Sequence, residues 1–174
     1  MIDTVSMLRA HGRQIVLAMA LSALGLGLAA VVLAELLRLS ACHLCIFQHL
    51  IHFAIGLTLL LAFWLWRRKV VAPLLLAGTS ALSIWGMVAS AQQSWLQWFP
   101  DSGLGCALTE PGLTERLIDW LGQFYPLFFM ATGSCESKDL VILGLSLANW
   151  SFLAFVAFLV ACVFLVFNRY KEGR

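Results

Sequence analysis

The chain has 174 residues, of which 61% are hydrophobic and only 11% are charged, and its net charge is +2 at pH 7. A water-soluble domain of this length cannot bury so much apolar surface. The composition therefore excludes an ordinary soluble protein and favours lipid as the solvent.

Four segments are long and apolar enough to cross a bilayer as helices, because a hydrocarbon core of about 30 Å takes roughly 20 helical residues. No segment alternates with the period of a barrel strand, so helices are the expected spans. The first segment is too long for a signal peptide and further spans follow it, so we interpret it as a retained anchor. The predicted spans are residues 14–37, 45–66, 71–91 and 140–167.

Basic residues predict the orientation of these spans. Eight of them fall at one end of the predicted bundle and three at the other. The eight are Arg9, Arg13, Arg67, Arg68, Lys69, Arg169, Lys171 and Arg174, and the three are Arg38, Arg116 and Lys138. Because cytoplasmic loops are enriched in Lys and Arg, we expect both termini in the cytoplasm, with segment 38–41 and loop 92–139 outside.

The outer loop contains the stretch L-T-E-R-L-I-D-W-L-G-Q-F, residues 113–124, in which apolar residues recur at helical spacing. The apolar stripe consists of Leu113, Leu117, Leu121 and Phe124, with Glu115, Arg116 and Asp119 off it. This pattern predicts a short amphipathic helix on the membrane surface. We therefore predict an all-α membrane protein, a single domain over residues 1–174. It is a four-transmembrane-helix bundle with a short interfacial helix in the long periplasmic loop.

The chain has five cysteines, and the predicted topology places four of them outside. The fifth, Cys162, lies in the last span, where we expect a small buried apolar residue. Four outer cysteines in two pairs suggest disulfides in an oxidising compartment such as a bacterial periplasm. For Cys106 and Cys135 a structural role stays open, since closing a loop of roughly 30 residues stabilises by about 3–4 kcal/mol on the chain-entropy model.

Cys42 and Cys45 form a C-x-x-C pair whose loop is too short for cross-linking to remove much chain entropy. A two-residue spacing is typical of redox dithiols or metal ligands. We expect Cys45 to open the second helix, where unpaired backbone N–H groups and the helix dipole favour a thiolate.

Two histidines follow on the same predicted helix. His49 and His52 lie near the face that carries Cys45, and a histidine inside a membrane helix tends to face the bundle interior. Either can be a structural residue bonded to a neighbouring helix, whereas His43, between the cysteines, is expected to be a plain loop residue. A non-catalytic protein that binds metal or haem through His49 and His52 is one alternative. A zinc site would use Cys42, Cys45, His49 and His52, in the pattern C-x2-C-x3-H-x2-H. Against zinc, this pattern has no finger-length segment, ends within the membrane and leaves the second cysteine pair unexplained.

The motifs around the cysteines resemble the disulfide bond formation protein B (DsbB) family. "ACHLCIFQH" is similar to the family's C-x-x-C-I-[FY]-x-R stretch, and "WFP" before Cys106 to its aromatic-Pro lead-in. "ATGSCES" around Cys135 is similar to A-S-G-x-C, and "LGLSLANW" to the entry of the last helix. The resemblance implies an inner-membrane enzyme that reoxidises a DsbA-like thioredoxin-fold dithiol oxidase. It would pass two electrons to the membrane quinone pool, ubiquinone or menaquinone, with no metal and no nucleic acid involved.

The resemblance also implies a role for each of the four outer cysteines. The redox-active disulfides would be Cys42–Cys45 and Cys106–Cys135. Cys106 would be attacked by the partner's thiolate, and Cys135 would exchange with Cys42. Cys45 would be the thiolate that meets the quinone.

Two departures from the family pattern fall in the implied quinone pocket. The family usually has Arg where this chain has His49, and its best-known member has His where this chain has Gln93. We predict that both His49 and Gln93 contact the quinone. For Gln93, as for Gln48 and Gln92, two readings stay open: polar lining of the pocket, or an interfacial residue without a ligand. A vitamin K epoxide reductase-like enzyme is the alternative within the same chemistry, although its motifs match less well.

Overall fold

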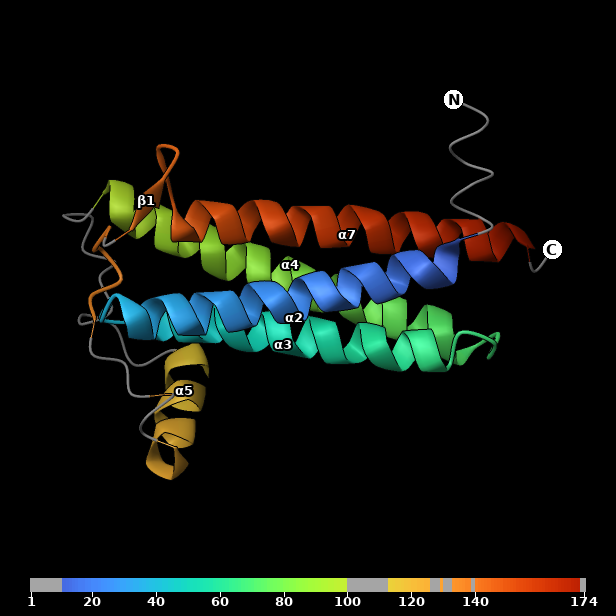
Figure 1. Cartoon of the computed structure of the whole chain (residues 1–174), viewed down its shortest axis with the longest axis horizontal. Helices are drawn as coiled ribbons and strands as arrows, with labels where there is room; N and C mark the ends of the chain where they lie inside the picture. Colours follow the sequence, from blue (N-terminus) through green and yellow to red (C-terminus); the bar gives the residue numbers. More distant parts are fainter. Residues whose placement is uncertain (1–10, 100–112, 126–128, 130–132, 139, 173–174) are drawn as a thin grey trace.

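The computed structural model of the chain describes residues 11–99, 113–125, 129, 133–138 and 140–172. Four long helices lie side by side along one axis (Figure 1). They are α2 (Gly12–Leu36), α3 (His43–Trp64), α4 (Val71–Trp98) and α7 (Leu147–Glu172). All four are long and apolar enough to cross a membrane. The all-α, four-helix membrane bundle predicted from the sequence is confirmed.

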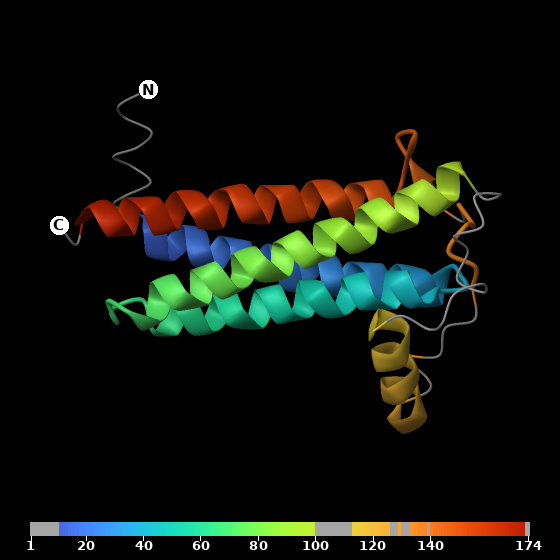
Figure 2. The same ribbon diagram turned by 180° about the vertical axis from the view of Figure 1, so that it is seen from behind.

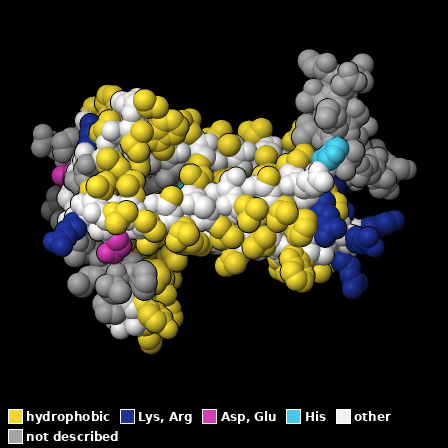
Figure 3. Space-filling model, in the orientation of Figure 1, with side chains coloured by type: hydrophobic (Ala, Val, Ile, Leu, Met, Phe, Trp, Pro, Cys, Tyr) yellow, Lys and Arg dark blue, Asp and Glu magenta, His cyan; other side chains and the backbone are white. Residues whose placement is uncertain are grey.

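The two ends of the bundle differ in what they carry. At one end α2 and α4 begin and α3 and α7 end; we call this the terminal end. On the face shown in Figure 3, Lys and Arg side chains gather at this end, whereas the middle of the bundle shows hydrophobic and uncharged groups. At the opposite end α3 begins with the C-x-x-C pair, and we call this the cysteine end.

The helix bounds differ from the predicted spans at the cysteine end. Helix α4 continues to Trp98, and α7 begins only at Leu147. Before α7 the chain forms a hairpin of β1 (Val141–Ile142) and β2 (Leu145–Ser146), paired antiparallel. The prediction of a helix from residue 140 was wrong, because Leu143 and Gly144 both take positive φ (53° and 81°). Positive φ at both central residues is the geometry of a two-residue hairpin turn.

Small residues allow the helices to approach closely. A Cβ on Gly86 of α4 would lie 2.7 Å from the ring of Phe155 in α7, so only glycine fits this crossing. Helix α4 runs between α3 and α7 (Figure 2). Its buried hydroxyls on Thr79, Ser83 and Ser90 donate to carbonyls four residues earlier. They are therefore satisfied without a partner from another helix.

A fifth helix, α5 (Leu113–Phe124), projects sideways from the cysteine end (Figure 1). It forms where the amphipathic pattern predicts it, and it packs on α3. Among the α5 side chains that the structure describes, Ile118 is fully buried, whereas Leu117, Trp120 and Phe124 are exposed. The placement of this apolar stripe on a membrane surface stays a prediction.

Candidate functional site

The C-x-x-C pair forms the beginning of α3. Cys42 is the N-cap residue, with extended backbone, and its Sγ accepts a hydrogen bond from the Cys45 N–H at 3.4 Å. The structure therefore corrects the expectation that Cys45 opens the helix: the sulfur at the cap belongs to Cys42, and Cys45 is the third helical residue. The two Sγ atoms are 3.2 Å apart, and the Cys42 thiol donates to Cys45.

Cys135 joins this pair from a segment far away in the sequence. Its side chain hydrogen-bonds with Cys42, and both residues are almost fully buried. The hydrogen bonds with Cys135 and Cys45, together with burial, raise the pKa of the Cys42 thiol far above its usual range. Cys42 is therefore a protonated thiol at neutral pH, placed between two other cysteine side chains.

A close backbone contact holds the Cys135 segment in place. The Gly133 N–H donates to the Ala41 carbonyl at 3.1 Å. A Cβ on Gly133 would lie 1.9 Å from the Ser40 carbonyl oxygen, so no side chain fits at this position. The glycine two residues before Cys135 thus lies directly against the residues that lead into Cys42.

Cys106 lies outside the described residues, so its pairing with Cys135 stays a prediction. Cys162 is fully buried in α7, as expected for a small apolar residue. Within the described parts of the chain, no group of three or more His, Cys, Asp or Glu side chains is placed to hold a metal ion.

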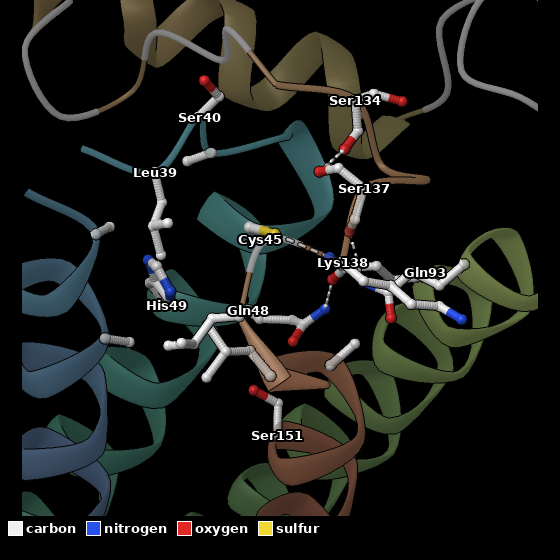
Figure 4. Close-up of a pocket in the computed structure, with 17 residues that line it drawn as sticks. Leu39, Ser40, Cys45, Gln48, His49, Gln93, Ser134, Ser137, Lys138 and Ser151 are labelled. Carbon is white, nitrogen blue, oxygen red and sulfur yellow. Dashed lines mark hydrogen bonds between the residues drawn. The ribbon is translucent and has the colours of Figure 1, made fainter. Parts of the chain in front are cut away.

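A cavity of about 100 Å³ lies beside Cys45, between α2, α3, α4, α7 and the Cys135 segment (Figure 4). It has several times the volume that one water molecule needs. The polar groups that α3 and α4 contribute to its lining are Cys45, Gln48, His49, Gln93 and Gln97. Apolar side chains such as Ala30, Ala34 and Leu147 line other parts of it. A reactive sulfur, amide donors and apolar walls fit a small, uncharged ring with polar oxygens.

Two buried carboxamides connect α4 to the reactive pair. Gln93 Nε2 donates to Cys45 Sγ at 2.9 Å and lies 3.7 Å from Cys42 Sγ. Gln48 Nε2 in turn donates to Gln93 Oε1 at 2.6 Å (Figure 4). Gln93 was predicted to contact the quinone. The structure places it in the lining of this cavity and in contact with the sulfurs, and the contact with a quinone stays a prediction. Gln92, the neighbouring glutamine, is exposed and does not line the cavity.

The two histidines of α3 occupy different environments. His49 lines the cavity on the side away from Gln93 (Figure 4). His52 is buried, with Nδ1 2.8 Å from the Gln48 carbonyl oxygen and its ring centroid 4.3 Å from that of Phe155. His52 therefore fits the structural reading, whereas His49 faces the space where a ligand can bind.

Sequence reasoning also missed a polar contact of His43. His43, expected to be a plain loop residue, begins α3 and places Nε2 3.0 Å from Asp119 Oδ1 of α5. The two residues are 76 positions apart, and no local pattern in the sequence relates them.

Comparison with known proteins identifies the family. A family model described as "Disulfide bond formation protein DsbB" matches residues 12–165. A protein named Disulfide bond formation protein B from Dechloromonas aromatica (strain RCB) is 44% identical over 149 residues, 86% of this chain and 88% of the relative. Proteins of the same name from Verminephrobacter eiseniae (strain EF01-2) and Azoarcus sp. (strain BH72) are 35% and 34% identical. These matches cover 71% and 74% of this chain, and 68% and 76% of the relatives.

The family match and the structure agree. The matched residues include all four membrane-length helices up to residue 165 and the cysteine segments at 42–45 and 135. The chain therefore belongs to the DsbB family of disulfide bond formation proteins, and is a multi-pass inner-membrane oxidoreductase that generates disulfides.

Proposed function

We propose that this chain reoxidises a DsbA-like periplasmic dithiol oxidase and passes the two electrons to a membrane quinone, ubiquinone or menaquinone. The observation that carries the proposal is the position of Cys42, whose side chain contacts both Cys45 and Cys135. Disulfide exchange requires such sulfur neighbours, because a thiolate attacks one sulfur of a disulfide and displaces the other.

Each cysteine has a separate task in this scheme. The reduced partner opens the Cys106–Cys135 disulfide through a mixed disulfide at Cys106. The Cys135 thiolate then attacks Cys42 of the Cys42–Cys45 disulfide and displaces Cys45 as a thiolate at the cavity. The second thiol of the partner forms the partner's own disulfide and releases Cys106 as a thiolate. Cys106 then attacks Cys135, which restores Cys106–Cys135 and leaves Cys42 and Cys45 as the reduced pair. Overall, the partner loses two electrons and two protons as its own disulfide forms.

The cavity beside Cys45 is the proposed quinone site. When bound there, the quinone would accept the two electrons and two protons. His49, Gln48 and Gln93 would hold its polar ring, and the alanines of α2 would contact its apolar face. A site at the bilayer edge suits an acceptor that dissolves in lipid.

The proposed orientation places the cysteine end in the periplasm and both termini in the cytoplasm. The terminal end carries Arg13, Arg67, Arg68 and Lys69, and basic side chains gather there in Figure 3. This distribution supports the orientation, because cytoplasmic segments of membrane proteins are enriched in Lys and Arg.

The test is a coupled assay with purified protein in detergent, a reduced DsbA-like oxidase and a short-chain quinone. We expect quinone absorbance to fall as the oxidase is oxidised, and Cys42→Ser to abolish turnover. Cys162→Ala is the matched control, since this cysteine is buried in α7 and does not line the cavity. Turnover that persists without Cys42 would exclude the scheme.

A further inference from the structure

We propose that Gln93 stabilises the Cys45 thiolate by donating an uncharged N–H to its sulfur, and that Gln48 is a positioning residue that keeps this donor aimed at Cys45. The inference rests on the proposed function, in which Cys45 is the thiolate next to the electron acceptor. It gives Gln93 a role toward the Cys45 sulfur, in addition to the quinone contact predicted from the sequence.

The geometry of Gln93 fits a thiolate-holding group. Its amide nitrogen is 2.9 Å from Cys45 Sγ, which is short for a hydrogen bond to sulfur. The same nitrogen is 3.7 Å from Cys42 Sγ, so the amide faces both sulfurs of the pair. Gln93 is only 4% exposed, and a hydrogen bond to a charged group gains strength where water is excluded.

Gln48 determines which end of the Gln93 amide faces the sulfur. A carboxamide has a donor end and an acceptor end of nearly the same shape. Because Gln48 Nε2 donates to Gln93 Oε1 at 2.6 Å, the oxygen is held away and the NH₂ group points at Cys45. Gln48 lies one helical turn after Cys45, so the sulfur and the group that positions its donor come from one face of α3.

Cys45 receives a second donor from Cys42, whose thiol lies 3.2 Å away. This donor disappears whenever Cys42 enters a disulfide, as it does when it exchanges with Cys135. The Gln93 donor does not depend on the redox state of Cys42. It is therefore the contact that stabilises a Cys45 thiolate displaced during exchange.

Other groups near Cys45 differ from Gln93 in being able to titrate. They are Cys42 and Cys135 in the cysteine cluster, and His49 and Lys138 in the cavity lining. The Lys138 ammonium lies 5.1 Å from the centroid of the Trp98 ring. An amide keeps its N–H at every pH, so the contribution of Gln93 is independent of the charge on these neighbours.

The test measures Cys45 without quinone and without a partner protein. The reduced full-length protein in detergent is alkylated at neutral pH, and the rate at Cys45 is followed by peptide mass spectrometry. A hydrogen bond to a charged group changes the thiolate fraction about tenfold or more. Part of this change is offset, because a less stabilised thiolate is a better nucleophile. We therefore expect Gln93→Leu to slow Cys45 alkylation about three- to tenfold.

Three further variants make the test specific. Gln93→Met keeps the length of the side chain but has no N–H or O–H donor, so it should slow alkylation about as much as Gln93→Leu. Gln93→His restores an N–H donor and should recover most of the rate. Gln92→Leu, the same substitution at the exposed neighbour, should leave the rate unchanged.

A double-mutant cycle tests Gln48. Gln48→Leu should slow Cys45 alkylation in the natural background and have no further effect when combined with Gln93→Leu. Additive effects would overturn the positioning role of Gln48. A Gln93→Leu rate equal to that of Gln92→Leu would overturn the proposal as a whole. If the alkylation results hold but the natural protein does not reduce quinone, the hydrogen bond stands and the proposed acceptor is wrong.

Discussion

The Cys42 sulfur makes three contacts: it caps α3, donates to Cys45 and contacts Cys135. These contacts keep the thiol protonated at neutral pH. In the reduced protein Cys42 is therefore a poor nucleophile, and the sulfurs on either side of it are left to begin an exchange.

Removing Cys135 should make Cys42 more reactive. The hydrogen bond with Cys135 is the largest of the effects that raise the pKa of Cys42. In Cys135→Ala this pKa should fall toward its ordinary value, so the thiolate fraction at mildly alkaline pH should rise. We expect faster alkylation of Cys42 in the reduced variant, measured by peptide mass spectrometry. Cys135→Ser keeps a hydrogen-bonding group and should stay near the natural rate; equal rates in both variants would contradict this account.

At the scale of elements, two segments dock on the start of α3. The Cys135 segment does so through Gly133, and α5 does so through Ile118 and the contact of Asp119 with His43. Through these contacts, two parts of the long loop lie next to the C-x-x-C pair.

Gly133→Ala should separate Cys135 from Cys42. The new methyl group would collide with the Ser40 carbonyl, a backbone atom that cannot rotate away. Because misplacement by about 1 Å can cost about 100-fold in a reaction, we expect formation of a Cys42–Cys135 disulfide to slow by about tenfold or more. The measurement is the rate of this disulfide in a Cys45→Ser, Cys106→Ser background under mild oxidant. Gly25→Ala is the control, since no atom lies within 4 Å of the added Cβ.

Burial of Ile118 should hold α5 more strongly than the His43–Asp119 contact. Asp119 is 61% exposed, and exposed ion pairs contribute about 0–1 kcal/mol. Ile118 is fully buried, and truncating such a residue to Ala costs about 2–5 kcal/mol. In hydrogen exchange, residues 113–124 should lose much more protection in Ile118→Ala than in Asp119→Asn. The reverse order would mean that the polar contact is the main one.

The parts of the fold that sequence reasoning predicted depend on local patterns. Long apolar runs predicted the four membrane helices, and the spacing of apolar residues predicted α5. The hairpin before α7 was missed because V-I-L-G-L-S is as apolar as a membrane span, and only the backbone angles of Leu143 and Gly144 separate it from α7. The contact of Gln93 with Cys45 depends on how α4 crosses α3, and no single segment encodes that crossing.

At the scale of the whole molecule, thiol labelling can measure which end of the bundle faces the periplasm. Leu143 at the hairpin turn of the cysteine end is 88% exposed, and Val70 at the terminal end is 69% exposed. In intact spheroplasts of a Cys106→Ala strain, a membrane-impermeant thiol reagent should label Leu143→Cys. It should label Val70→Cys only after the membrane is disrupted. The opposite pattern would place the cysteine end in the cytoplasm.

The contacts around the Cys45 sulfur also bear on the reduction potential of the pair. The Cys42 thiol and the Gln93 amide both hydrogen-bond to this sulfur in the reduced state. A dithiol whose reduced form is stabilised is a stronger oxidant, by about 30 mV for each tenfold change in the equilibrium constant. The hydrogen bonds at the start of α3 therefore favour reduction of the Cys42–Cys45 disulfide and oppose oxidation of the reduced pair. In the proposed function, the quinone would therefore need a still higher potential, and in the cavity beside Cys45 it would lie next to the sulfur.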